Sequence, residues 1–191
     1  MNDLLGTAYL FLPLLGGGLF HGLAMKYDWF AFLRRPIDGG RAWRGVPIFG
    51  ANKTWRGPVA LGIGSALVMG AQSILAARVA AFRGVGLVDY AHLNGWAWGF
   101  ALGFAAMLAE LPNSFAKRRL GVGPGEARGG AMGALLYVAD QIDLLAGAWI
   151  VLAFLVDVTV SRVLWSATIV ALAHQGLTLF AHATGMRASA R

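Results

Sequence analysis

The stretch GALLYVADQIDLLAGAWIVLAFLV, residues 133–156, is a long apolar run that carries two aspartates. About 20 apolar residues are enough to cross the hydrocarbon core of a bilayer as a helix. Asp140 and Asp143 are three residues apart, so they share one face of that helix. An ionised carboxylate inside a membrane is costly unless it is paired, hydrated or bound to a metal. The stretch therefore predicts a membrane helix with a functional acidic pair.

The composition agrees with a membrane protein. The chain has 191 residues, of which 58% are hydrophobic and only 13% are charged, a balance typical of a bundle of membrane helices. Five apolar stretches are long enough to span a bilayer: residues 4–25, 58–81, 94–111, 131–156 and 160–182. We therefore expect an all-α integral membrane protein with five transmembrane helices, forming a single domain over residues 1–191.

Some classes of protein are excluded at once. The chain has no cysteine, so disulfide frameworks and thiolate zinc sites are impossible. The basic residues follow the connections between the apolar stretches and do not form a nucleic-acid-binding module, so we expect no nucleic-acid partner.

The cations are distributed unevenly between the two sides of the expected bundle. Those of the first loop are Lys26, Arg34, Arg35, Arg41, Arg44, Lys53 and Arg56; those of the third loop and the tail are Lys117, Arg118, Arg119, Arg128, Arg187 and Arg191. The other side holds Arg78, Arg83 and Arg162. The positive-inside rule places the first and third loops and the C-terminus in the cytoplasm, with the N-terminus outside.

One face of the third apolar stretch is lined by small residues. Gly95, Gly99 and Gly103 are spaced by four residues, which lets the backbone of another helix approach closely. The pattern predicts a tight helix–helix contact along this face.

The first loop ends in the motif PIFGANKTWRG, residues 47–57. Asn52, Lys53, Thr54 and Arg56 offer amide, ammonium, hydroxyl and guanidinium donors within five residues, a set that suits phosphate oxygens. The alternative is a loop whose cations only report membrane topology.

The third loop, AELPNSFAKRRLGVGPGEARGG at residues 109–130, combines acidic, hydroxyl and basic side chains. Glu110 ends the third span, and a nearby proline is expected to break the helix there. Asn113 and Ser114 are then expected to cap a new helical turn. That turn would carry Lys117 and Arg118 to the face of Ser114 and gather them around one anion. The alternative is a basic stop-transfer cluster with Glu110 at the membrane interface.

A divalent cation would solve two problems of the acidic pair at once. Asp140 and Asp143 would repel each other if both were ionised, and a bound cation compensates both charges. Magnesium prefers one or two carboxylates together with substrate phosphates. The alternative is that a lysine or arginine pairs with the aspartates for structural reasons. The expected site, acidic ligands capped by cations from two cytoplasmic loops, suits a nucleoside triphosphate and a lipid phosphate from the inner leaflet.

Three motifs carry a resemblance that covers nearly the whole chain. NKTWRG at residues 52–57, ELPNSFAKRRLGVGPG at 110–125 and DQID at 140–143 resemble the archaeal CDP-archaeol synthases, which are membrane cytidylyltransferases. A more distant similarity links the chain to the phosphatidate cytidylyltransferases, whose KKTWEG loop is similar to residues 52–57.

The signature of the phosphatidate enzymes is similar to a larger set of positions, namely Ser114, Lys117, Arg118, Pro124, Gly125, Asp140 and Asp143. Glu110 stands where those enzymes have an aspartate before a leucine. Their Lys-Asp pair is absent, and their His-Gly-Gly corresponds here to Arg128, Gly129 and Gly130. These departures favour the archaeol-type subfamily.

The resemblance implies a reaction and a set of roles. CTP and a lipid phosphate would give CDP-lipid and pyrophosphate, with Mg²⁺ as the cofactor. Metal binding is implied for Asp140, Asp143 and Glu110; phosphate binding for Lys53, Lys117, Arg118 and Arg119; and nucleotide hydrogen bonding for Asn52, Thr54, Asn113 and Ser114. Two other interpretations stay open, a CTP-dependent lipid kinase and a non-catalytic binder or transporter of anionic lipid or phosphate. Their products separate them: CDP-lipid with pyrophosphate, CDP with a phospholipid, or none.

The uneven distribution of cations yields a topology prediction. In cells, a cysteine introduced at Ala127 should react with an impermeant thiol reagent only from the cytoplasmic side, and one at Ala91 only from outside. The native chain has no cysteine, so the unmodified protein is a clean background. Reversed labelling would place the two basic loops outside the cell.

Overall fold

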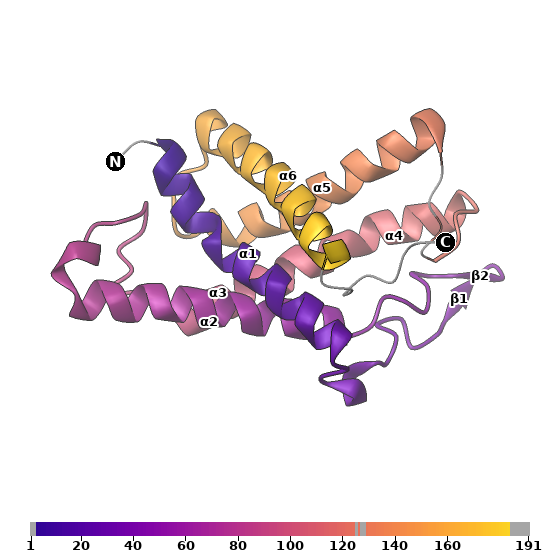
Figure 1. Cartoon of the computed structure of the whole chain (residues 1–191). Helices are drawn as coiled ribbons and strands as arrows, with labels where there is room; N and C mark the ends of the chain where they lie inside the picture. Colours follow the sequence, from indigo (N-terminus) through magenta and orange to yellow (C-terminus); the bar gives the residue numbers. More distant parts are fainter. Residues whose placement is uncertain (1–2, 125, 127–128, 184–191) are drawn as a thin grey trace.

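The computed structural model describes residues 3–124, 126 and 129–183, and it is a bundle of helices with one small hairpin (Figure 1). The helices are α1 (Asp3–Lys26), α2 (Arg56–Arg78), α3 (Gly95–Leu108), α4 (Glu110–Arg119), α5 (Gly130–Leu152) and α6 (Val160–Ala183). Two 3-10 turns, η1 (Ala31–Leu33) and η2 (Ala80–Phe82), lie in connections. The strands β1 (Ala42–Trp43) and β2 (Val46–Pro47) pair antiparallel.

The helical character of the fold confirms the expected class. Three helices, α1, α2 and α5, are long and apolar enough to cross a membrane, and α6 contains a shorter apolar stretch, Val160–Ala173. Each of the five expected spans coincides with a helix. The count of five transmembrane segments and their orientation stay predictions.

The expected break in the third span was placed wrongly. Pro112 was expected to end the helix, but α3 ends at Leu108 and α4 begins at Glu110. Proline is compatible with the first turn of a helix, because the backbone N–H that it lacks has no partner there in any case. Pro112 therefore lies inside α4, and Asn113 is a helical residue whose side chain is free to contact another helix.

The glycine face of α3 packs directly against α2, as its spacing predicts. A methyl group at Gly103 would lie 2.5 Å from the Leu61 carbonyl oxygen, and one at Gly99 would lie 2.6 Å from the carbonyl oxygen of Ser65. Gly95 makes a similarly close approach to the carbonyl of Met69. These contacts hold α2 and α3 together as the most extensively packed pair of the bundle.

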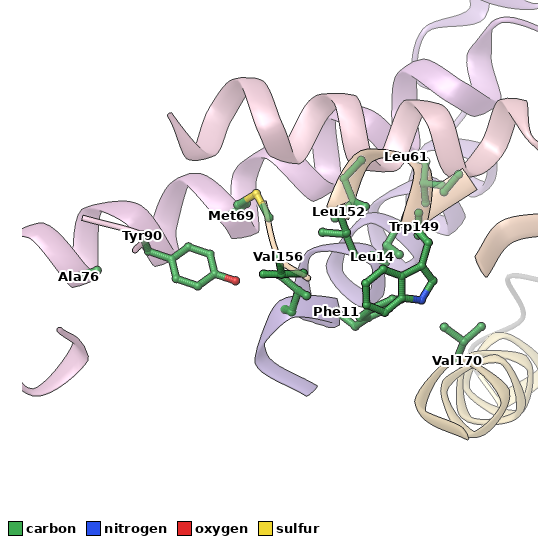
Figure 2. Packing of buried hydrophobic residues seen from close by; sticks show 14 residues of the cluster. Phe11, Leu14, Leu61, Met69, Ala76, Tyr90, Trp149, Leu152, Val156 and Val170 are labelled. Carbon is green, nitrogen blue, oxygen red and sulfur yellow. The ribbon is translucent and has the colours of Figure 1, made fainter. Parts of the chain in front are cut away.

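The core lies where α1, α2, α3 and α5 converge, and Figure 2 shows its side chains. Phe11 of α1 packs near the Trp149 ring of α5, with ring centroids 6.0 Å apart. The Trp149 indole N–H donates a hydrogen bond of 2.9 Å to the Ser166 hydroxyl and so ties α5 to α6. A buried indole or hydroxyl needs such a partner. This core fixes the position of α5, the helix that carries the acidic pair.

The polar connections gather at the two ends of the α2–α3 pair. Figure 1 shows the hairpin and α4 toward one end of this pair, and the connection that contains η2 at the opposite end. The motif-bearing loops therefore meet on one side of the bundle.

The tight α2–α3 contact makes a stability prediction. Gly103→Ala should lower the melting temperature in detergent, because overpacking of a close contact typically costs about 1–3 kcal/mol. Thermal unfolding followed by tryptophan fluorescence measures the change. Gly22→Ala in α1 is the matched control, since nothing lies within 4 Å of the added methyl group and alanine favours the helix. Equal melting temperatures for the two variants would contradict the contact.

Candidate active site

An acid–base contact joins α4 to the acidic pair of α5. The Lys117 ammonium lies 2.5 Å from the Asp140 carboxylate, and the Asn113 amide donates a hydrogen bond of 2.7 Å to the same oxygen. Asn113 and Lys117 are four residues apart on α4, so both face α5. The placement of Asn113 inside a helix, which the sequence did not predict, is what allows this contact.

A second ion pair joins α4 to the first loop. The Lys53 ammonium lies 2.5 Å from the carboxylate of Glu110, the first residue of α4. Both side chains are about three-quarters buried. The 57 residues between them in the chain bring the NKTWRG motif to the start of α4. Two of the three motifs therefore meet at α4, and the third faces it from α5.

Asp143 belongs to the same cluster. Its carboxylate lies near the Asn113 amide and near the charged groups of Asp140, Lys117 and Lys53. One of its carboxylate oxygens, Oδ2, is buried and has no hydrogen-bond partner within the part of the chain that the structure describes. A buried carboxylate oxygen without a partner is unusual in a folded protein and calls for an explanation, such as a bound water or ion.

The predicted magnesium ligands fit a site that substrate phosphates would complete better than a site formed by protein ligands alone. Among the described residues, no three acidic or histidine side chains converge on one point. Glu110 and Asp140 face lysines, and Asp143 keeps the unpartnered oxygen. Magnesium characteristically takes one or two protein carboxylates and completes its coordination with water and substrate phosphates. The acidic pair on α5 meets that requirement.

The first and third loops come into close contact where Gly50 meets Pro124. Gly50 has φ +102°, a backbone conformation that favours glycine, and a methyl group there would lie 3.0 Å from the Pro124 ring and 3.3 Å from the Asn52 side-chain oxygen. Asn52 therefore lies next to the point where the loops meet. Thr54 is held nearby through an isolated β-bridge with Pro36.

Asp38 organises the interior of the first loop. Its carboxylate accepts hydrogen bonds of 2.9 Å from the backbone N–H groups of Gly40 and Phe49. Burial alone would raise the pKa of Asp38, but these backbone hydrogen bonds outweigh it and lower the pKa below its ordinary value. A carboxylate that stays ionised is a strong acceptor for such turns, so Asp38 holds the loop in shape.

Arg119, expected to bind phosphate, is engaged with the hairpin. Its guanidinium donates hydrogen bonds of 2.7, 2.9 and 2.7 Å to the carbonyl oxygens of Trp43, Val46 and Pro47. The same group lies 5.4 Å from the Trp43 ring centroid and 5.0 Å from that of Phe115. Planar stacking combined with several donors is characteristic of arginine. The structure thus gives Arg119 a structural task that the sequence did not predict.

Arg118 and Ser114 share a buried face of α4. The Arg118 side chain is 7% exposed, and Ser114 is 4% exposed. Arg118 donates a hydrogen bond of 2.6 Å to the carbonyl oxygen of Val122 and so closes the end of α4. Lys117 instead faces Asp140. The expected gathering of all three around one anion is not present in this arrangement.

Sequence reasoning missed two residues near the basic loop. Asp28, just beyond α1, accepts a hydrogen bond of 2.7 Å from Arg56 and pairs with Arg34. His21 of α1 lies near the start of α2, because a methyl group at Gly57 would lie 3.9 Å from its Nε2 atom. Arg56 lies 28 residues after Asp28 in the chain, and no local pattern connects the two, so no sequence signal could have identified this contact.

The chain matches the family model described as CarS-like, CDP-archaeol synthase, over residues 25–190. The chain belongs to the CDP-archaeol synthase family. Members of this family are nucleotidyltransferases that use CTP, and the chain is an enzyme of this class. The resemblance found in the sequence motifs is confirmed.

Similar relatives support the assignment to the CDP-archaeol synthase family. The CDP-archaeol synthase of Methanosphaerula palustris is 32% identical over 159 residues, which cover 80% of this chain and 87% of that protein. The CDP-archaeol synthase of Halorubrum lacusprofundi is 40% identical over 124 residues, 64% of this chain and 61% of that protein. A solved structure of an intramembrane enzyme of archaeal membrane lipid biosynthesis is similar with a TM-score of 0.60 and 25% identity, covering 90% of this chain and 91% of that one.

The anchoring of the hairpin can be tested with one conservative change. Arg119→Lys should loosen residues 42–47, because an ammonium cannot hold three carbonyl oxygens and stack between two rings. Hydrogen exchange read by mass spectrometry should show faster exchange in peptides that cover the hairpin. Arg83→Lys, at the far end of the bundle, is the matched control. Unchanged exchange in Arg119→Lys would show that the hairpin is stable without the Arg119 contacts.

Proposed function

We propose that the chain transfers CMP from CTP to a lipid phosphate, releasing pyrophosphate and a CDP-lipid. The observation that carries the proposal is the position of α4, which brings Lys53 of the first loop and Asp140 of α5 into one charged cluster through Glu110 and Lys117. Family membership supports the same reaction.

The chemistry of the transfer is a substitution at phosphorus. An oxygen of the lipid phosphate attacks the α-phosphorus of CTP, the bond from that phosphorus to the bridging oxygen breaks, and pyrophosphate leaves with the bonding electrons. Such reactions are accelerated mainly by positioning and by stabilising charge. Lys53 and Lys117 are the lysines that neutralise the phosphate oxygens. Each is held by a carboxylate in this structure, so each ammonium is placed in advance.

Asp140 and Asp143, with Glu110, are the residues that would hold Mg²⁺. When bound, the ion would supply charge neutralisation for the triphosphate and for the departing pyrophosphate. The unpartnered oxygen of Asp143 supports this role from the structure. The lysine that faces Asp140 keeps that carboxylate compensated while no nucleotide is present, which an acidic group inside the bundle requires.

Donors of the loops complete the proposed nucleotide site. Arg56 is proposed to bind phosphate, and Asn52, Thr54 and Asn113 to form hydrogen bonds with the nucleotide. Proposed contributions from Ser114, Arg118 and Arg119 are indirect, because their side chains are buried or engaged with backbone carbonyls. They shape the third loop and the hairpin around the cluster.

The lipid phosphate is proposed to reach the cluster sideways from the inner leaflet, with its chains along α5. Leu135, Val138 and Ile142 on α5 are exposed in the bundle and lie near Asp140 in sequence. An apolar helix surface beside a charged site suits a molecule with lipid chains and a phosphate head group. The archaeol-type motifs favour an isoprenoid ether lipid phosphate. The proposed topology has five spans, with the N-terminus outside and the charged cluster facing the cytoplasm.

One reconstitution experiment tests the reaction. Purified protein in lipid vesicles should release pyrophosphate only when CTP, a lipid phosphate and Mg²⁺ are all present, and mass spectrometry should detect the CDP-lipid. A panel of archaeol-type and diacyl lipid phosphates identifies the acceptor. Release of CDP with a newly phosphorylated lipid would instead identify a kinase, and no turnover with any acceptor would leave a binder or transporter.

Asp143→Asn is the matched variant for that assay. The amide keeps the shape and removes the charge, so turnover should fall by about 100-fold or more at the wild-type magnesium concentration. The melting temperature in chelator should stay equal or rise, since repulsion between Asp143 and Asp140 is relieved. Full activity with wild-type magnesium dependence would remove Asp143 from the proposed ligands.

A further inference from the structure

Asp28 joins two arginines from different parts of the first loop. Its Oδ1 atom accepts a hydrogen bond of 2.7 Å from Arg56 Nη1 and forms an ion pair with Arg34. Asp28 lies directly beyond α1 and has φ +57°, a left-handed conformation that aspartate and asparagine tolerate better than most residues. No motif of the sequence includes it.

Within the described part of the chain, Asp28 is the side chain that holds the Arg56 guanidinium. Arg56 is the first residue of α2, and its side chain is 14% exposed. A guanidinium carries five N–H donors, and the contact with Asp28 uses Nη1. The Arg56 Nε atom is buried and finds no hydrogen-bond partner among the described residues. The group is therefore fixed in position through Nη1, and the side chain, which stays partly exposed, has further N–H donors for another acceptor.

Arg56 lies in the charged region that contains Lys53. Lys53 precedes Arg56 by three residues and contacts Glu110. Asp28 thus fixes where the Arg56 guanidinium lies, three residues along the chain from the ammonium of Lys53.

We propose that Asp28 is a positioning residue, which holds the Arg56 guanidinium beside Lys53 so that it binds a phosphate of the nucleotide. The inference rests on the proposed function and extends it to a residue outside the motifs. A half-exposed ion pair contributes little to stability, so the main consequence of the contact is the orientation of Arg56.

The test uses four variants of the full-length protein: Asp28→Asn, Arg56→Gln, the double variant and Arg34→Gln. Asparagine suits the left-handed backbone, so Asp28→Asn removes the charge with little strain. We expect the KM for CTP to rise about fivefold in Asp28→Asn and about tenfold in Arg56→Gln, with kcat within about twofold of wild type, because a binding contact is lost. Arg34→Gln is the matched control and should keep the KM of wild type.

The double variant separates positioning from a general structural role. If Asp28 acts through Arg56, the double variant has the same KM as Arg56→Gln alone, because contacting residues are not additive. Multiplied effects, or an equal rise in KM in Arg34→Gln, would overturn the inference. A normal KM in Asp28→Asn with an active wild-type enzyme would also overturn it and leave the proposed function standing.

A binding measurement separates a failure of the role proposed for Asp28 from a failure of the proposed function. CTP with Mg²⁺ should raise the melting temperature of the wild-type protein, and at equal CTP concentration the rise should be smaller in Asp28→Asn than in Arg34→Gln. No shift and no turnover in the wild-type protein would refute the proposed function, and the role of Asp28 with it.

Discussion

Carboxylates inside an apolar helix must be compensated, and the arrangement of the site follows from that constraint. Asp140 and Asp143 lie on α5, a helix long and apolar enough to cross a membrane. The compensation comes from α4, whose Asn113 and Lys117 both contact Asp140. Because α4 must lie beside α5 to provide it, its first residue, Glu110, is placed within reach of Lys53. A single electrostatic requirement thus brings three distant segments together.

The loops around this cluster are held in place by hydrogen bonds to backbone groups and by one close contact between the loops. Asp38 holds the turns of the first loop through backbone N–H groups, and Arg119 holds the hairpin through three carbonyl oxygens. Gly50 meets Pro124 where the first and third loops touch. Polar backbone outside regular structure needs such partners. These contacts hold the side chains of long connections in fixed positions.

Sequence patterns predicted the parts of the fold that depend on periodicity. The apolar stretches became helices, and the spacing of Gly95, Gly99 and Gly103 predicted the face that packs on α2. The composition of the motifs predicted that Lys53, Lys117 and Asp140 lie near one another. The start of α4 was missed because proline tolerates a first helical turn as well as it ends a helix. The hairpin, the engagement of Arg119 and the contact of Asp28 with Arg56 depend on partners far along the chain, which leave no local pattern.

The hydrogen bonds between Arg119 and the hairpin have a consequence for the order of folding during biosynthesis. Arg119 follows its hairpin partners by 72 to 76 residues in the chain, and α2 and α3 lie between them. During synthesis the hairpin therefore leaves the ribosome before its anchor, and it lacks the Arg119 contacts until α4 has been synthesised. The charged cluster closes only after most of the bundle is inserted. A chain truncated before α4 would lack Glu110, Lys117 and Arg119, so it could form neither ion pair of the cluster nor the anchor of the hairpin.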